Sequence, residues 1–298
     1  MANTDVGIAA GGLGKTIAAA IVQFNKASVT PRTVSMAPAV PGSHTVQFPV
    51  YSKLGVSDVT NEATGDEDTE VAATSITTAA TNVEVLRNHI NARITDLAAY
   101  GNNDALMVNA GQVLGNAVAA EFDANICALF DGFATSKGTD DGLRFIDIMD
   151  AVASLETNDA PRPYSAVLHP QQVYGSFGLS NEFGSTAVNG SNGAFGGASA
   201  AIPADQYMGA GYVTSLAGIN IYTTTAVPDG ADATEKKGAV MSETAIGCGY
   251  IDFGGGNFMQ MTQEREEVQA KTVLVANGYY AVAELVDLHG VEMHTEIS

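Results

Sequence analysis

A glycine-rich segment near the N-terminus has the residue types of a phosphate-binding loop. In such loops backbone N–H groups surround the phosphates and a lysine reaches them, and Gly11–Thr16 (GGLGKT) has part of that pattern. The first glycine of the full pattern is missing, because Ala9 stands in its place. The loop must also follow a buried strand, and only Met1–Ile8 precede it. We therefore interpret Gly11–Thr16 as a segment of small residues before a short helix, and nucleotide binding is the alternative.

Patterns for metal binding and for nucleophilic catalysis are also incomplete. The acidic run Asp66–Glu70 begins like a calcium loop, but Val71 stands where that loop needs glycine and Thr77 where it needs glutamate. The five histidines lack the paired spacing of zinc ligands. No serine lies in a Gly-x-Ser-x-Gly elbow. The sequence therefore predicts no catalytic residue, no metal ligand and no cofactor site.

The charge composition excludes several kinds of binding protein. Lysine and arginine number 13 against 33 aspartate and glutamate residues, so the formal net charge is −20. Sequence-specific nucleic-acid binding and attachment to anionic membranes both need clustered basic residues, so neither is expected. No apolar run reaches the roughly 18 residues of a membrane span. Only 15% of residues are charged, which suits a surface covered by other subunits, because charge is depleted in interface cores.

The two cysteines, Cys127 and Cys248, are too few for a disulfide framework. Free cysteine behaves as a small hydrophobic residue. We expect both thiols to be buried and not bonded to each other, with Cys127 on a long helix and Cys248 among later strands.

Local patterns predict an extended arm and then a hairpin in the N-terminal part. The segment Ser28–Pro41 carries Pro31, Pro38 and Pro41 and few bulky side chains, which predicts an extended arm, and Thr16–Phe24 before it could form a short helix. Alternation over His44–Val50 predicts a strand, Asp66–Glu70 a solvated loop tip, and Val71–Ala80 a returning strand. Because a hairpin alone is marginal in water, we expect this one to need a partner.

A long apolar helix is predicted in the middle of the chain. Ala105–Phe130 contains no proline and follows good N-cap residues. Such a helix would be about 39 Å long at 1.5 Å per residue. Gly111 and Gly115 form a small-xxx-small pair, which predicts that a neighbouring element packs closely against the helix. The preceding segment, Val83–Asp96, is compatible with either a strand or a helix.

The remaining sequence predicts a mixed body. A second helix is expected over Leu143–Leu155, and strands over Tyr164–Leu168, Gly218–Thr225 and Gly238–Phe253. Asn277-Gly278 separates two β-rich runs and predicts a hairpin turn, because a type I′ turn needs positive φ at both residues. The order of elements predicts the α+β class.

Several segments resemble a known family. They are Leu114–Asp123 in the long helix, Ala166–Tyr174 with a strand, a proline and a helix, and Gly218–Pro228 with a strand and a turn. Together with the order of elements, they resemble the major capsid proteins of tailed phages, which have the Hong Kong 97-type capsid fold.

The resemblance implies an α+β fold in four parts. Its parts would be an N-terminal arm (1–42), an extended loop hairpin (43–80), a peripheral domain (81–140 and 259–287) with a spine helix at Asp104–Phe130, and an axial domain (141–258 and 288–298). Asn277-Gly278 would be the tip of a late peripheral hairpin. The extended loop would be mobile in a free subunit and would lie across a neighbour in a shell.

The resemblance also implies a function that needs no catalytic, cofactor or metal residue. The chain would be a non-enzymatic subunit that self-assembles, as hexamers and pentamers, into the icosahedral head shell around double-stranded DNA. It would reside in the virion capsid after assembly in the host cytoplasm. Expected partners are other copies, separate scaffolding, portal and decoration proteins, and packaged DNA without sequence-specific binding; no membrane is expected. An encapsulin-type compartment is the first alternative, and a P-loop ATPase the second.

Overall fold

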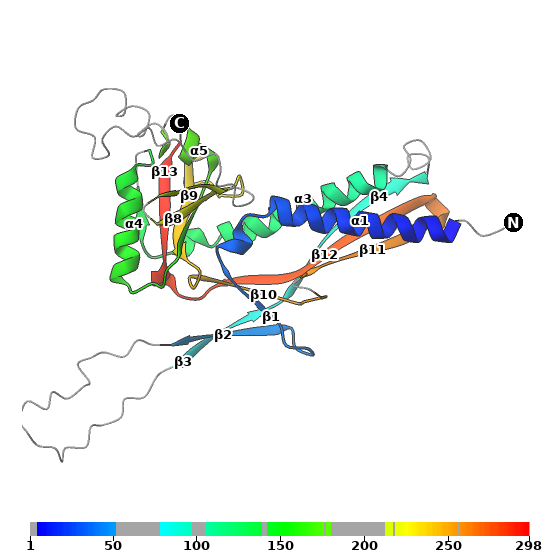
Figure 1. Cartoon of the computed structure of the whole chain (residues 1–298), viewed down its shortest axis with the longest axis horizontal. Helices are drawn as coiled ribbons and strands as arrows, with labels where there is room; N and C mark the ends of the chain where they lie inside the picture. Colours follow the sequence, from blue (N-terminus) through cyan, green and yellow to red (C-terminus); the bar gives the residue numbers. More distant parts are fainter. Residues whose placement is uncertain are drawn as a thin grey trace, which may run out of the picture.

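One long strand forms the axis of an elongated five-stranded sheet (Figure 1). The structure is a computed structural model that describes residues 5–51, 78–96, 105–138, 142–175, 177–179, 212–216, 218–254 and 257–297. Strand β12 (Lys271–Glu284) pairs along one edge with β4 (Leu86–Thr95). Along its other edge it pairs with β11 (Met259–Glu266) and β10 (Ile246–Tyr250), and β1 (Ser35–Pro38) pairs in parallel with β10. The segment Val83–Asp96, which the sequence left open, is therefore largely a strand.

The predicted turn at Asn277-Gly278 is wrong. Both residues lie inside β12, where Asn277 is in register with His89 on β4 and with Gln260 on β11. The chain turns instead at the 3-10 helix Glu267–Gln269, after which Ala270 has a φ of 45°. Pairing along both edges of β12 outweighs the local preference of Asn-Gly for a turn. A turn at these residues would leave buried backbone N–H and C=O groups without hydrogen-bond partners.

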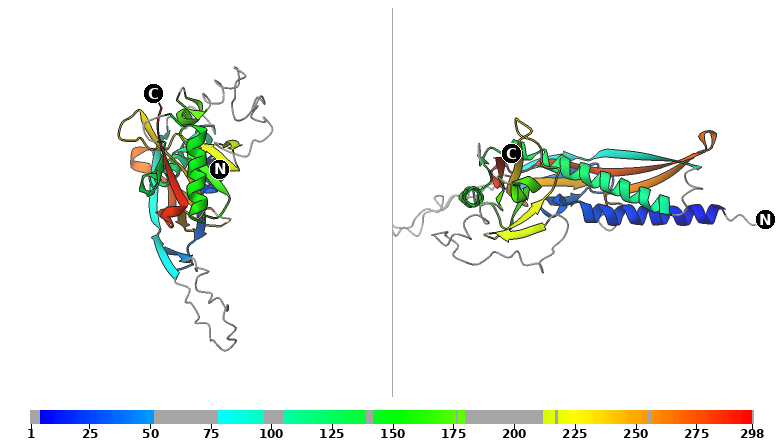
Figure 2. Two further views of the ribbon diagram at one scale, coloured as in Figure 1. Left: turned by 90° about the vertical axis from the view of Figure 1, so that its left-hand side faces the viewer. Right: turned by 90° about the horizontal axis from the view of Figure 1, so that it is seen from above.

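Helix α3 (Ala105–Cys127) lies across one face of this sheet (Figures 1 and 2). It begins close to the predicted residue and presents Leu114, Val118, Phe122 and Ile126 to the core. The Phe122 ring is 4.8 Å from that of Tyr280 on β12 and 5.2 Å from that of Phe258, between ring centroids. By length and composition Val108–Gly132 could cross a membrane, but 50% of its most apolar window is buried inside the protein, as in a core helix.

The short helix predicted over Thr16–Phe24 is much longer than expected, because Asp5–Ala27 forms the 23-residue helix α1. Figures 1 and 2 show α1 alongside α3. A Cβ atom added at Gly111 would lie 2.5 Å from the carbonyl oxygen of Thr16, and one at Gly115 would lie 2.4 Å from that of Ala20. The predicted close packing at these glycines is therefore confirmed, and its partner is the N-terminal segment itself. Residues 5–27 are helical because α3 supplies the apolar surface against which this helix packs.

The predicted hairpin is present at its base. Strands β2 (Thr45–Tyr51) and β3 (Thr78–Glu84) are antiparallel, with Thr45 opposite Glu84 and Tyr51 opposite Thr78. They form a separate two-stranded sheet. The predicted loop tip at Asp66–Glu70 lies outside the described residues.

The body beyond the elongated sheet contains a six-stranded sheet in the order β5-β13-β9-β6-β8-β7. Helices α4 and α5 accompany it, and Figure 1 shows α4 along one side. The elements are β5 (Ser136–Lys137), α4 (Phe145–Thr157), β6 (Tyr164–Leu168), α5 (Pro170–Tyr174), β7 (Tyr212–Leu216), β8 (Ile219–Thr223), β9 (Glu235–Ser242) and β13 (Gly290–Glu296), with 3-10 helices at Thr30–Arg32, Phe130–Gly132 and Asp287–His289. The predicted second helix and the strand-proline-helix step are confirmed.

The predicted boundary at residue 258 does not separate the two sheets. Strand β10 lies on the N-terminal side of that boundary, yet it pairs with β12, with Cys248 in register with Val282. Strand β9, only a few residues earlier, belongs to the six-stranded sheet. The chain therefore passes from one sheet to the other between Ser242 and Ile246.

We predict that Gly115→Leu destabilises the chain although leucine favours helix more than glycine does. The new side chain needs the space that the backbone of α1 occupies, and such overpacking costs about 2–3 kcal/mol. Ala120→Leu, at an exposed position of the same helix, is the control and should change stability by about 0.5 kcal/mol or less. Urea unfolding followed by circular dichroism measures both, and equal stabilities would contradict the close helix contact.

Candidate assembly surfaces

The glycine-rich segment does not form a phosphate-binding loop. Gly11–Thr16 lie inside α1, where backbone N–H groups bond to the carbonyl four residues earlier instead of surrounding an anion. Thr16 is fully buried, and its carbonyl oxygen lies against Gly111 on α3. The segment is therefore helical rather than a lead-in to a short helix, and this geometry does not support the P-loop alternative.

Three of the described histidines make separate local contacts. His169 accepts a hydrogen bond at Nδ1 from the Gln171 N–H at 3.2 Å and so caps α5, and burial lowers its pKa. His289 Nδ1 lies 2.7 Å from the Thr244 hydroxyl, and His294 Nε2 lies 2.9 Å from a Glu235 carboxylate oxygen. Within the described part of the chain, no group of three or more potential metal-ligating side chains occurs.

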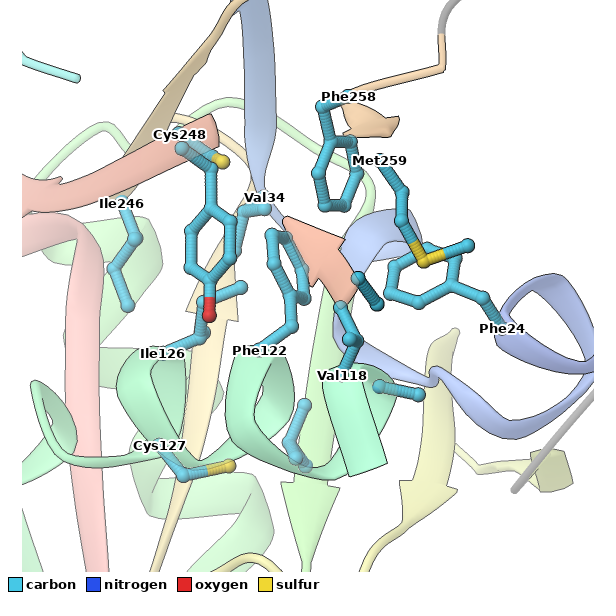
Figure 3. Packing of buried hydrophobic residues seen from close by; sticks show 14 of the residues in the cluster. Phe24, Val34, Val118, Phe122, Ile126, Cys127, Ile246, Cys248, Phe258 and Met259 are labelled. Atoms are coloured by element: carbon cyan, nitrogen blue, oxygen red, sulfur yellow. The ribbon is translucent and has the colours of Figure 1, made fainter. Parts of the chain in front are cut away.

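Cys127 and Cys248 are free and buried, as predicted, but they share one core instead of lying in two separate regions. Figure 3 shows them well separated within the cluster around Phe122. Burial, with a smaller contribution from the Asp123 charge, raises the pKa of the Cys127 thiol. Burial raises the pKa of Cys248 to about 12. Both thiols therefore stay protonated at neutral pH, and neither is an activated nucleophile.

A buried carboxylate on α3 fixes the chain just after α1. Asp123 is only 3% exposed and accepts hydrogen bonds from the backbone N–H groups of Val29 and Thr30. The hydroxyls of Thr30, at 2.6 Å, and Ser28, at 3.2 Å, also donate to it. Burial raises the pKa of this carboxyl group, and the four donor groups oppose that rise. Asp123 thereby sets the direction in which the chain leaves α1 toward β1 and the hairpin.

The base of the hairpin is fixed by its own small core. Val46, Phe48, Val83 and Val85 are buried and pack against a group on and beside the five-stranded sheet that includes Tyr279, Ala281 and Ala283. The contact is close, because a Cβ atom added at Gly249 on β10 would lie 2.9 Å from a methyl carbon of Val46. These residues hold the hairpin on the face of the sheet opposite α3, which we call the outer face.

The distal half of the outer face is polar. Residues directly opposite one another on neighbouring strands share a face, so the pairing fixes its members as Arg87, His89, Asn91, Arg93 and Thr95 on β4, Lys271, Val273, Val275 and Asn277 on β12, and Gln260, Thr262, Glu264 and Glu266 on β11. The alternate residues, such as Ile94, Leu274 and Met261, belong to the core beneath α3.

The architecture matches that of solved capsid structures. The chain resembles the capsid of Ralstonia phage GP4 with a TM-score of 0.63 and 11% identity over 92% of each chain. It resembles the capsid of the cyanophage P-SCSP1u with a TM-score of 0.59 and 16% identity over 92% of this chain and 90% of that one. The chain has the Hong Kong 97-type capsid fold.

The same fold occurs in an encapsulin. The holo-SrpI encapsulin complex from Synechococcus elongatus matches with a TM-score of 0.55 and 10% identity, over 90% of this chain and 87% of that one. No protein-family model matches the sequence, and no curated protein matches it. The structural likeness thus confirms the Hong Kong 97-type fold expected from the sequence. The sequence identities of 10–16% to these structures support a shared fold.

Sequence reasoning missed the two features that organise these surfaces. The sequence places Asp123 only on the predicted helix, although a carboxylate on an apolar helix face indicates a buried acceptor. The outer face of β4 is not predicted, because the pattern of Val83–Asp96 is compatible with either a strand or a helix. The alternation of Arg87, His89 and Arg93 with Ile90 and Ile94 is the signal that a strand assignment would have exposed.

We predict that Asp123→Asn lowers the free energy of unfolding by about 2 kcal/mol, because hydrogen bonds to a charged acceptor are lost and an amide adds unpaired donors. Glu121→Gln, an exposed carboxylate on the same helix, is the control and should have little effect. Thermal and urea unfolding measure both. Equal stabilities of the two variants would show that Asp123 does not fix the segment after α1.

We predict that neither cysteine reacts with Ellman's reagent at pH 8 while the chain is folded, because both thiols are buried and protonated. Unfolding in guanidinium should release both thiols together. Rapid labelling of the native protein, or a missing thiol after unfolding without reductant, would contradict this arrangement.

Proposed function

We propose that this chain is the structural subunit of an icosahedral head shell that encloses the double-stranded DNA of a tailed phage. The likeness of fold supports this, since it covers 92% of the chain in the capsids of phages GP4 and P-SCSP1u. The proposed role is non-enzymatic and assigns no catalytic, metal or cofactor residue.

The observation that carries the proposal is the hairpin ribbon of β2 and β3. The two strands pair with each other, and only their base packs on the outer face. At the outer end Tyr51 is 65% exposed. Figure 1 shows the ribbon below the rest of the subunit, running away from the distal end of the elongated sheet. A two-stranded ribbon alone is marginal in water, so a neighbouring subunit is the surface that would stabilise it.

In a closed shell such contacts act together. Each subunit gives a hairpin to one neighbour and receives one from another, so every interface is repeated by symmetry. Once some contacts in a ring have formed, the others form within one particle at high effective concentration. A contact too weak to hold a dimer can therefore stabilise a lattice.

We propose the division into parts with one change that follows from the strand pairing. Residues 1–42 remain the N-terminal part, which contains α1, and 43–80 the extended loop hairpin. The peripheral domain takes 81–140, 259–287 and also β10, because β10 pairs with β12. The axial domain then takes the rest of 141–258 together with 288–298, which contains the six-stranded sheet.

The proposed partners follow from a shell. They are other copies in hexamers and pentamers, separate scaffolding, portal and decoration proteins, and packaged DNA held without sequence recognition. A net charge of −20 per chain would keep DNA from adhering to the wall. The proposed location is the virion capsid, after assembly in the host cytoplasm.

An encapsulin-type compartment is the second candidate, favoured by the likeness to the Synechococcus encapsulin. The contents of assembled particles separate the two proposals. Particles produced by infected cells should contain double-stranded DNA if the chain forms a phage head, and a protein cargo if it forms a compartment.

We predict that replacing Gly55–Glu70 by a short Gly-Ser turn leaves a folded subunit that assembles poorly. The base strands and their core lie outside the deletion, so circular dichroism and thermal unfolding of the dispersed subunit should be unchanged. Sedimentation and electron microscopy should show shell-sized particles for the full chain and few for the shortened one.

A same-length replacement of Gly55–Glu70 by Gly and Ser is the matched control, because it keeps the length of the loop and removes its side chains. It should assemble as poorly as the shortened chain, because the side chains of the loop make the proposed contacts with the neighbouring subunit. Full-size particles of normal thermal stability from the shortened chain would refute the intersubunit role of the loop.

A further inference from the structure

Strand β12 holds a chemically labile pair of residues, Asn277-Gly278, in its interior. The side chain of an asparagine can cyclise onto the backbone nitrogen of the next residue, and glycine hinders that attack least because it has no Cβ. Asn277 is 7% exposed, and Gly278 is also buried. The fold therefore keeps this pair in an extended, buried strand instead of the exposed turn that its local sequence favours.

The strand ladders on both sides of the pair oppose cyclisation. Gly278 is in register with Asn88 on β4 and with Met259 on β11. The N–H group of the next residue, Tyr279, donates a hydrogen bond to the carbonyl oxygen of Phe258 at 3.0 Å. Ring closure needs the backbone between Asn277 and Gly278 to rotate out of the extended range of a strand. That rotation would break hydrogen bonds of buried backbone groups.

The core beneath Gly278 opposes the same rotation. A Cβ atom added at Gly278 would lie 3.2 Å from a ring carbon of Tyr280 and 3.7 Å from a methyl carbon of Val118 on α3. The Tyr280 ring in turn lies 4.8 Å from that of Phe122, between centroids. A movement of Gly278 would therefore disturb the aromatic cluster between α3 and the sheet. The pair can rotate freely only after this part of the sheet has opened.

The side-chain oxygen of Asn277 is not held by a hydrogen bond. It is buried without a hydrogen-bond partner among the described residues, and an unsatisfied buried acceptor destabilises the fold. The carboxamide is thus protected by the backbone around it and not by bonds of its own oxygen. A valine at this position would remove the reactive group and keep the preference for a strand.

We propose that Asn277-Gly278 is a latent modification site that reacts when β12 leaves its ladders. The Gly278 nitrogen attacks Cγ of Asn277 and loses its proton to water, the bond from Cγ to Nδ2 breaks, and ammonia leaves with a succinimide remaining. Water then opens the ring to aspartate or to isoaspartate. The reaction needs no other reactant, and the site is independent of the proposed shell function.

Neither product fits the folded strand. Aspartate would place a carboxylate at a buried position, and burying a charge is costly. Isoaspartate adds one carbon to the backbone, which breaks the alternation of side chains after residue 277. Tyr280 would then lose its place against Phe122 in the core. The modification therefore makes unfolding of this sheet irreversible.

The experiment measures modification of the full chain at mildly alkaline pH, folded and in concentrated guanidinium chloride. Samples are acidified, unfolded and digested with trypsin, which cleaves after Lys271, so the peptide Thr272–Ser298 contains Asn277 as its single asparagine. Mass spectrometry detects the conversion of amide to acid. The folded chain should react at least about a hundredfold more slowly, because the rate follows the small open population. In denaturant Asn277 should react as fast as Asn189 and Asn192, which also precede glycine.

Two variants of α3 show whether the reaction needs the sheet to open. Asp123→Asn should speed the modification of the folded chain by the same factor by which it raises the unfolding equilibrium constant. Glu121→Gln makes the same chemical change at an exposed position and should leave the rate unchanged.

Refolding after incubation in denaturant tests irreversibility. The unmodified sequence should lose native circular dichroism in proportion to the fraction modified at Asn277. Asn277→Val should fold normally and should keep that signal after the same incubation, although Asn189 and Asn192 still react in it. Asn277→Thr is the second variant without the carboxamide.

Several results would overturn the proposal. A folded chain that reacts within about tenfold of the unfolded rate is not protected by its ladders. A rate that does not rise in a destabilised Asp123→Asn chain would show that the pair reacts without opening of the sheet. Chains modified at Asn277 that refold as well as unmodified ones, or an equal loss of signal in Asn277→Val and Asn277→Thr, would show that the modification does not block refolding.

Discussion

The contact of Phe122 with the sheet is the interaction on which the rest of the structure depends. Its ring lies 4.8 Å from Tyr280, 5.2 Å from Phe258 and 6.0 Å from Phe24, between centroids, so α3, β12, the start of β11 and α1 meet at one side chain. Figure 3 shows Phe24, Phe122 and Phe258 gathered in this cluster. Because large apolar rings dominate the energetics of a core, this cluster decides which face of the sheet is covered. The opposite face is then left for the hairpin and for the exposed polar residues.

Elements with a strong period of their own were predictable from the sequence. The spacing of apolar residues predicted four elements: the long helix, the second helix, the strand before Pro170 and strand β2. Each of them buries one face, so its apolar residues recur at the period of a helix or a strand. The resemblance in the order of these elements also led to the correct fold. The glycines at 111 and 115 correctly indicated a close neighbour, although nothing in the sequence showed that the neighbour was α1.

The failures arose where distant partners decide local structure. Residues 5–27 contain several glycines and are followed by prolines, yet they form a helix. They do so because α3, at Gly111 and Gly115, allows the backbone of this segment to pack directly against it. Asn277-Gly278 has the local preference of a turn but lies between two strands that pair with both of its edges. The buried role of Asp123 depends on Val29 and Thr30, far away in sequence. Such contacts can be identified only in the folded chain, because the local sequence around one partner does not indicate which distant residue it will contact.

The length of β12 has a mechanical consequence. At about 3.4 Å per residue, its 14 residues span roughly 48 Å without a break, and ladders flank it on both edges. A force pulling the two ends of the subunit apart acts along this strand. It loads the interstrand hydrogen bonds in shear, so many must break at once, whereas a sideways force opens them one after another. The subunit is therefore stiff in tension along the sheet and compliant in bending across it.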